Sequence, residues 1–162
     1  MSLYIRQKAM SLVDRFSVMD EQGNEKYYVE GELLFFGRRL HIFDVTGAEV
    51  GRVERKNWSF KSRYFVFTDS DEPIAEIVRE FTLLRPYYTV NGPGWDVEGN
   101  FTEHTYEVRD GDRIVAVVEK EWLTWGDCYE LDIAPDVDEL TALAVLLGID
   151  CAVADAAAAA AT

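Results

Sequence analysis

The sequence predicts a mainly β protein: a closed barrel of about twelve strands that encloses a hydrophobic helix near the C-terminus. Three observations support this fold class. Between Leu3 and Ala134, short runs rich in β-branched and aromatic residues alternate with turn signals, at the spacing of roughly ten to twelve strands. The same part of the chain shows no long amphipathic helical pattern. The segment from Leu140 to Val153 would be apolar on every side of a helix, and such a helix must be buried all round.

The strands are predicted from their period and composition. The runs HTYEVRD (104–110) and DCYELDI (127–133) alternate between two faces, as a half-buried strand does. β-branched and aromatic residues are frequent in four further runs, KYYVEGELLFFG, RRLHIFDV, RYFVFT and RIVAVVEKEW. Turns between strands are indicated by MDEQGNEK, DVTGAEV, DSDEP and RDGDR. A sheet of this size tends to curl or close, and a barrel this wide has more interior than its own side chains fill.

The C-terminal segment is predicted to fill that interior as a helix near 138–153. Asp136 is a plausible N-cap, and Glu139 three residues later completes a capping-box pattern. At 1.5 Å per residue the apolar part would be about 21 Å long, close to the length of a six-residue strand. We therefore expect one domain over 1–154 and an alanine-rich tail over 155–162, which resembles a frayed helical end.

A transmembrane span is not expected from this segment. The strongly apolar part is shorter than the usual ~20 residues of a bilayer crossing. Asp150 lies near the middle of the segment, where an aspartate costs about 2.5–3.5 kcal/mol on insertion scales. A core helix explains the same composition without this cost.

Net charge argues against two classes of partner. The chain carries −14, with 16 Lys and Arg residues against 30 Asp and Glu residues, so general binding to nucleic acid or to an anionic membrane is not expected. The charge is uneven: residues 1–63 carry +2 and residues 64–162 carry −16. Arg outnumbers Lys eleven to five. An acidic surface poor in Lys fits a protein that stays soluble in high salt, which makes a halophilic source an open alternative to an ordinary acidic protein.

The two cysteines, Cys128 and Cys151, form no CxxC pattern and indicate neither a disulfide framework nor a zinc site. No cofactor or metal is expected from any motif. The first ten residues contain no long apolar stretch of the kind found in secretory signals, so a cytoplasmic location is expected.

Five stretches of the sequence resemble one known family. They are LYIRQKAMSLVDRFSVMDEQGNEKYYVEGE, GRRLHIFDVTGAEVGRVERK, GWDVEGNF, KEWLTWGDCYELDIA and DELTALAVLLGIDC. In this order they resemble the LURP-one-related family, which belongs with the tubby C-terminal domain and the phospholipid scramblases, and the chain looks like a prokaryotic member. The resemblance implies a closed tubby-like barrel of about twelve strands around a hydrophobic C-terminal helix, over the chain up to about Val153.

The resemblance implies no activity. Tubby domains bind phosphoinositide head groups through Lys and Arg, but no motif here aligns with that site. Scramblase relatives are linked to calcium and to cysteine palmitoylation, and this sequence has neither an EF-hand-like loop nor a cysteine cluster.

The stretch RVERKNWSFKSR (52–63) is the main candidate site. It contains five basic residues and one acid, with Trp58 and Phe60 interleaved. The candidate ligands are Arg52, Arg55, Lys56, Lys61 and Arg63. They could form a patch for an anionic lipid head group or another small anion. The alternative is structural: a strand edge protected by Lys and Arg, or a patch that offsets the acidic half.

Other residues favour structural roles. His41 and His104 each lie in a predicted strand, and a hydrogen-bonded wall or surface histidine is the simpler interpretation. Trp122 and Trp125 are expected to pack a barrel end against the helix. The irregular glycines of 91–100 indicate a loop and a tight corner rather than a phosphate-binding loop.

The leading functional hypothesis is therefore a non-enzymatic binding or scaffold module for an anionic lipid head group or other small anion. An enzyme of unknown reaction, with a site at a barrel end, and a purely structural protein-interaction domain remain alternatives. A pocket that holds His104 beside an acid would favour the enzyme.

Overall fold

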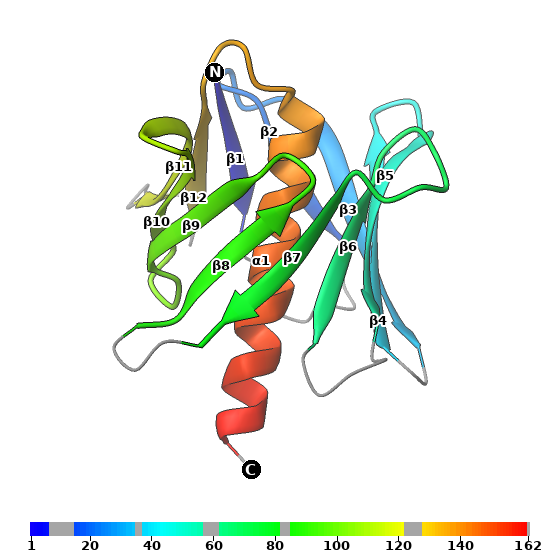
Figure 1. Ribbon diagram of the computed structural model, residues 1–162. Helices are drawn as coiled ribbons and strands as arrows, with labels where there is room; N and C mark the ends of the chain where they lie inside the picture. The colour runs from blue at the N-terminus through cyan, green and yellow to red at the C-terminus, as the bar shows by residue number, and fades with distance from the viewer. Residues whose placement is uncertain (7–14, 35–36, 57–61, 82–84, 122–127, 162) are drawn as a thin grey trace.

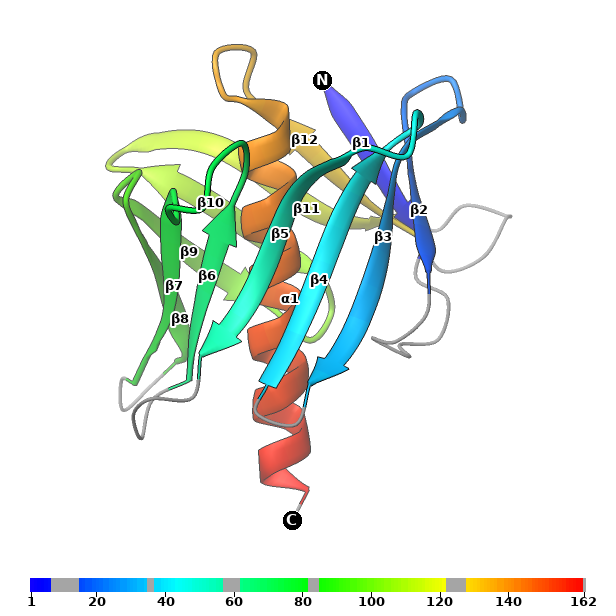
Figure 2. The same cartoon turned by 90° about the vertical axis from the view of Figure 1, so that its right-hand side faces the viewer.

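The computed structural model describes residues 1–6, 15–34, 37–56, 62–81, 85–121 and 128–161. Within these residues, twelve antiparallel strands form one closed barrel around a single helix (Figures 1 and 2). The strands are β1 (Ser2–Arg6), β2 (Phe16–Met19), β3 (Glu25–Leu34), β4 (Gly37–Asp44), β5 (Glu49–Lys56), β6 (Arg63–Phe67), β7 (Ala75–Glu80), β8 (Tyr87–Asn91), β9 (Trp95–Asn100), β10 (Thr105–Asp110), β11 (Arg113–Glu121) and β12 (Cys128–Ile133). The helix is α1 (Glu139–Ala160). The predicted fold class is confirmed.

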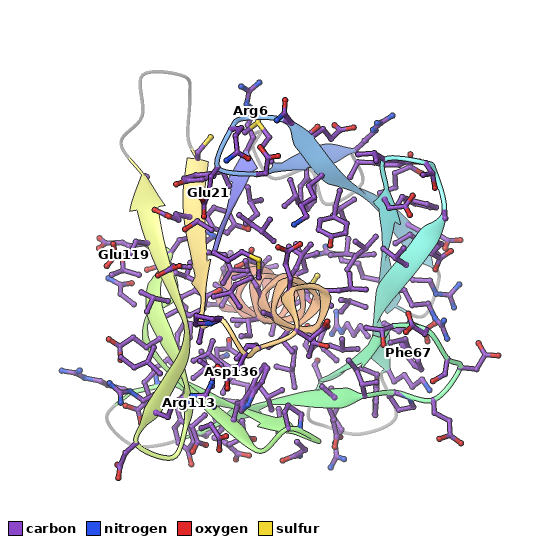
Figure 3. The ribbon with its side chains drawn as sticks, turned by 90° about the horizontal axis from the view of Figure 1, so that it is seen from above. Arg6, Glu21, Phe67, Arg113, Glu119 and Asp136 are labelled. Carbon is purple, nitrogen blue, oxygen red and sulfur yellow. The ribbon has the colours of Figure 1, made fainter. Side chains whose placement is uncertain are left out.

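The strands follow one another around the barrel in chain order. Each pairs with its neighbours in the sequence, and β1 pairs with β12 to close the ring, from Ser2 opposite Asp132 to Arg6 opposite Cys128. Closure leaves none of these twelve strands with an unpaired edge, which removes the need for edge protection that one interpretation of the basic stretch assumed. Seen from above, the strands surround the helix on all sides (Figure 3).

The helix is buried along its middle, as its composition predicts. Every residue from Ala142 to Ala152 is buried, including Leu143 and Ile149 at 0% exposure. A Cβ at Gly148 would come within 2.3 Å of the Cδ1 atom of Ile77, so glycine allows the helix to lie close to β7. By length and composition alone α1 could cross a membrane, but 61% of its most apolar window is buried inside the barrel.

Both ends of the helix differ from the prediction. Asp138, not Asp136, is the N-cap: its backbone is extended, and its carboxylate accepts a hydrogen bond of 2.8 Å from the Thr141 amide. Asp136 instead pairs with Arg113, and the two lie close together in Figure 3. The helix also continues beyond the predicted end at Val153, because alanine has the highest helix propensity and continues a helix without needing burial.

The helix axis gives the barrel two different ends. At the upper end in Figure 1 the chain passes from β12 into α1, and at the lower end the last turns of α1 emerge from the ring. Glu139 anchors the helix at the upper end, through a hydrogen bond of 2.9 Å from Tyr27 and an ion pair of 2.7 Å with Lys26. The turns after β2, β4, β6, β8 and β10 also lie at the upper end.

Candidate functional site

The predicted anion patch is divided by strand β5, whose side chains alternate between the two faces of the barrel wall. Gly51 and Val53 are buried toward α1, and Arg55 shares their face. Arg52 and Lys56 therefore point outward. A stretch that is continuous in sequence thus contributes to two separate surfaces.

On the outer surface, Arg52 and Lys56 cover aromatic rings of β6. The guanidinium carbon of Arg52 lies 4.1 Å from the ring centre of Phe67, and the Lys56 ammonium lies 5.0 Å from that of Phe65. Arg52 also donates a hydrogen bond of 3.0 Å to Glu54. These are cation–π and ion-pair contacts of a packed surface, in which Phe67 is only 3% exposed.

The other predicted ligands lie elsewhere. Arg63 donates a hydrogen bond of 2.7 Å to Glu76 on the neighbouring strand β7. Lys61 falls outside the described residues, as do Trp58, Phe60 and the Trp122 to Trp125 segment. Of the four predicted ligands that the structure describes, Arg55 is the one on the inner face.

On the inner face, Arg55 belongs to a group of three arginines around the lower part of the helix. Arg38 of β4 and Arg79 of β7 share the inward faces of their strands with buried aliphatic residues. The carboxylate of Asp155 lies among them, 3.2 Å from Arg55 Nη1 and 3.5 Å from Arg38 Nη1. The hydroxyl of Tyr64 donates a hydrogen bond to the same carboxylate. Two positive charges therefore pair with one negative charge, and Arg79 lines the same pocket.

Beside Asp155 the barrel wall and the helix leave a pocket of about 230 Å³. Its lining consists of Arg55, Ser62, Tyr64, Arg79, Phe81, Ala152, Asp155, Ala156 and Ala159. The Nε atoms of Arg55 and Arg79 are both buried, and neither has a hydrogen-bond partner among the described residues. Buried donors without an acceptor are rare in native proteins, so Arg55 and Arg79 stand out among the residues that line this pocket.

Tyr64 is held as a neutral donor in this group. Burial, and next the hydrogen bond to Asp155, raise the pKa of the Tyr64 hydroxyl well above its usual range. The hydroxyl keeps its proton at any physiological pH and directs it to the carboxylate. Asp155 is thereby fixed in position at the wall of the pocket.

A second polar cluster lies deeper, around Asp150 in the middle of α1. Tyr129 donates a hydrogen bond to Asp150, and the Tyr106 hydroxyl lies 3.5 Å from it. The Nε2 atom of His104 is 3.6 Å from the same carboxylate, and its ring stacks on that of Tyr129 with centres 4.5 Å apart. Burial raises the pKa of Asp150, against the opposing effects of His104 and the two hydroxyls.

This cluster places a histidine beside an acid, the arrangement that would favour an enzyme. Its burial argues against that use. His104 is 9% exposed and Asp150 is 7% exposed, and their polar atoms face each other rather than the pocket described above. Burial also raises the pKa of the neighbouring Cys151 thiol to about 12, which removes it as a nucleophile near neutral pH. We interpret the cluster as a structural polar link between the helix and the wall.

His41 is also engaged structurally. Its two ring nitrogens lie 3.1 Å from Glu49 and 3.1 Å from Glu32 on the outer surface. Burial lowers the pKa of His41, but hydrogen bonds to the two glutamates outweigh this effect and raise it. His41 is therefore a hydrogen-bonded residue of strand β4, as predicted. His104 lies in the turn before β10, with a positive φ of 51°, and not in a strand as predicted.

The upper end of the barrel is strongly acidic. Its turns, 20–24, 45–48, 68–74, 92–94, 111–112 and 134–138, contain eight acidic residues and no Lys or Arg. The acids are Asp20, Glu21, Asp69, Asp71, Glu72, Asp112, Asp136 and Asp138. Within the described residues, no group of three His, Cys, Asp or Glu side chains is arranged to hold a metal ion. The loops 69–72 and 109–112 are turn and strand-end segments, as expected.

The lower end has the opposite character. Exposed basic residues stand next to the ends of its strands, namely Arg6, Arg15, Lys56, Arg63 and Arg85. Glu80, Glu103 and Glu121 are acids at comparable positions of the described chain. The two ends of the barrel therefore differ in charge.

Three residues of the pocket group were missed by sequence reasoning: Arg38, Arg79 and Asp155. A usable signal existed for the arginines, because each is two residues from a buried aliphatic residue on its strand and so shares an inward face. Asp155 is the one charged residue in the alanine-rich segment after Asp150. Its pairing with residues more than ninety positions away could not be read from local pattern.

Comparisons with known proteins agree with this architecture. A family profile described as LURP-one-related matches residues 1–150. The uncharacterized protein YxjI of Bacillus subtilis (strain 168) is 29% identical over 148 residues, which are 91% of this chain and 91% of that protein. An X-ray structure of a protein from Arabidopsis thaliana superposes with a TM-score of 0.64 at 18% identity, over 94% of this chain and 90% of that one. This structural likeness extends over the whole barrel and concerns the fold.

Proposed function

The chain belongs to the LURP-one-related family, and we propose that it is a non-enzymatic binding module whose lower-end pocket holds a small oxyanion. One observation carries the proposal. Arg55 and Arg79, from strands β5 and β7, line the same pocket, and each has a buried Nε donor without a partner among the described residues. Guanidinium groups are planar donors that match the oxygens of phosphate and carboxylate.

The energetics favour an occupied pocket. Two arginine side chains line the pocket against one carboxylate. A buried donor left without an acceptor costs roughly 1–3 kcal/mol, so a bound oxyanion toward which Arg55 and Arg79 rotate would relieve this cost. Asp155 balances part of the positive charge, but Arg38 also lies beside that carboxylate, so the group remains positive overall. An anion is therefore the ligand that the charge and the open donors both favour.

Titration calorimetry with inorganic phosphate and with sulfate tests the proposal. We expect binding to the wild-type protein, and a loss of about tenfold to a hundredfold in affinity for Arg79→Gln, the range of a hydrogen bond to a charged group. Arg79 is the better target, because Arg55 also pairs with Asp155. Arg113→Gln is the matched control, since Arg113 lies at the upper end and pairs with Asp136. Absence of binding by either anion, or equal binding by Arg79→Gln, would reject the proposal.

An anionic lipid head group is a second candidate, favoured by the charge difference between the barrel ends. The basic lower end would face the membrane and the acidic upper end would point away from it. Phe81, 72% exposed at the rim of the pocket, would contact the lipid. Orientation of this kind also resolves the conflict between the basic stretch and the net charge of −14.

Co-sedimentation with anionic liposomes over a range of salt concentrations tests this candidate. Each basic residue near an anionic surface is worth about 1 kcal/mol, so replacing Arg55, Lys56 and Lys61 with Gln should weaken binding by about two decades. Binding should also fall as salt rises, because exposed charges are screened beyond about 8–10 Å. Liposome binding that is absent at low salt, or unchanged in the triple variant, would leave the soluble anion as the only candidate of the two.

A further inference from the structure

We propose that Asp155 makes the lower-end pocket selective for an oxyanion that still carries a proton, hydrogen phosphate, over a fully deprotonated one such as sulfate. The inference rests on the proposed function and specifies its ligand. One feature of the pocket is unexpected for an anion site: a carboxylate, that of Asp155, lines it, while its other charged groups are arginines. A site built only to attract negative charge would not place an acid against the ligand.

Asp155 cannot leave the wall of the pocket, because three groups hold it. Its Oδ2 atom accepts a hydrogen bond from Tyr64 and lies 3.2 Å from Arg55 Nη1. Its Oδ1 atom lies 3.5 Å from Arg38 Nη1, an ion-pair distance at which no hydrogen bond forms. The side chain is 14% exposed, so a small part of it faces solvent or ligand.

The acceptor capacity of Asp155 is therefore not exhausted. An ionised carboxylate has two oxygens with about four lone-pair sites, and Oδ1 accepts no hydrogen bond from the described residues. A ligand oxygen that brings a proton can donate it to this carboxylate. A ligand oxygen without a proton would place its lone pairs against those of the carboxylate and be repelled.

Inorganic phosphate satisfies both parts of the pocket. At neutral pH each phosphate ion keeps at least one proton, which it can donate to Asp155, while its other oxygens accept hydrogen bonds from Arg55 and Arg79. Sulfate has a similar shape and charge but no proton. A phosphate monoester has lost its second proton near neutral pH, since that pKa is about 6, and regains it in mild acid. The pocket should therefore discriminate between anions by their protonation.

The test is titration calorimetry of the wild-type protein with inorganic phosphate, sulfate and methyl phosphate. We expect phosphate to bind at least about tenfold more tightly than sulfate, the effect of one charge-assisted hydrogen bond replaced by a repulsion. Methyl phosphate should bind more tightly at pH 5 than at pH 7.5, because protonation makes it a donor. These two measurements require no variant.

Asp155→Asn identifies the residue responsible. An amide can donate to sulfate and carries no charge, so the preference for phosphate should fall to within about threefold, mainly through tighter sulfate binding. Asp136→Asn, which removes a carboxylate from the upper end, should leave the preference unchanged. A melting curve for each variant establishes that it is folded.

The outcomes separate the two proposals. Equal affinity of the wild-type protein for phosphate and sulfate would overturn the selectivity and leave the anion pocket standing. A preference for phosphate that persists in folded Asp155→Asn would overturn the role of this residue. If neither anion binds, the proposed function fails and this inference fails with it. Should Asp155→Asn not fold, a methyl phosphate affinity that does not change between pH 5 and pH 7.5 would still overturn the inference.

Discussion

The hydroxyl of Tyr129, on the last strand of the barrel, donates a hydrogen bond to the carboxylate of Asp150, in the middle of the enclosed helix. Both side chains are buried, and the bond joins helix to wall near the centre of the molecule. Burial raises the pKa of the Tyr129 hydroxyl well above its usual range, so it remains a donor. Between the contacts of Glu139 and Asp155 at its two ends, the buried middle of the helix thereby has a polar contact that distinguishes its rotation and depth.

Removal of this acceptor should destabilise the barrel. Asp150→Ala leaves the Tyr129 and Tyr106 hydroxyls buried without an acceptor, and we expect a loss of about 2–4 kcal/mol in the free energy of unfolding. Urea denaturation measures it. The double variant Asp150→Ala, Tyr129→Phe should lose less unfolding free energy than the sum of the two single variants. Tyr129→Phe removes one of the two hydroxyl donors that Asp150→Ala leaves without an acceptor. Strictly additive losses would contradict the contact.

The helix core should not tolerate charge. Leu143 and Leu147 are 0% and 1% exposed, and an unpaired buried charge costs several kcal/mol against a typical total stability of about 5–15 kcal/mol. We expect Leu143→Asp and Leu147→Asp to abolish cooperative folding, as observed by circular dichroism during heating. Ala158→Asp is the control on the exposed end of the same helix and should melt like the wild type. A soluble, cooperatively melting Leu147→Asp protein would show that the helix is not enclosed.

Two truncations should separate the anchored from the exposed part of the helix end. A chain ending at Ala156 keeps Asp155 and its contacts with Tyr64 and Arg55, so its melting temperature should change little. A chain ending at Ala154 loses them and should be less stable by about 1–3 kcal/mol, because three partners lose their carboxylate. Equal melting temperatures for the two chains would show that Asp155 does not hold the helix end.

His41 should make stability depend on pH. Its pKa is raised in the folded protein by hydrogen bonds to Glu49 and Glu32, which exceed the opposing effect of burial. A raised pKa means that the stabilisation is fully present below the usual value of about 6.5 and is lost as the pH rises through the folded value. The unfolding free energy of the wild type should therefore decline as the pH rises above about 6.5, relative to that of His41→Gln. Parallel pH profiles for the two proteins would refute this assignment.

Much of the fold could be predicted from local pattern. The alternation of Tyr129 and Leu131 with Glu130 and Asp132 is enough to identify β12 as a strand, and both pairs lie on the faces that the period assigns. Composition predicts the helix but not the residue at which it begins. Asp136 and Asp138 are both acceptable caps by residue type, and only the backbone conformation of the turn makes Asp138 the N-cap.

The candidate site was predictable only in part. The excess of basic residues at 52–63 led to the hypothesis of an anion patch, but a stretch on one strand alternates between outside and inside. Arg55 faces the pocket because it lies two residues after the buried Val53 and so points to the same side of β5. Arg52 lies on the outer surface over Phe67. Arg79, its partner in the pocket, lies outside the stretch altogether.

The sequence by itself determined the period-two strands, the turns between them and a helix too apolar for anything but an enclosed position, because each depends on neighbours within a few residues. Tertiary structure alone decided which charges meet. Closing the barrel brings Arg55, Arg79 and Asp155 to one pocket although they are far apart in the chain. It also places acidic turns at one end of the barrel and basic strand ends at the other. These pairings depend on register and closure, which are properties of the whole sheet rather than of any one segment.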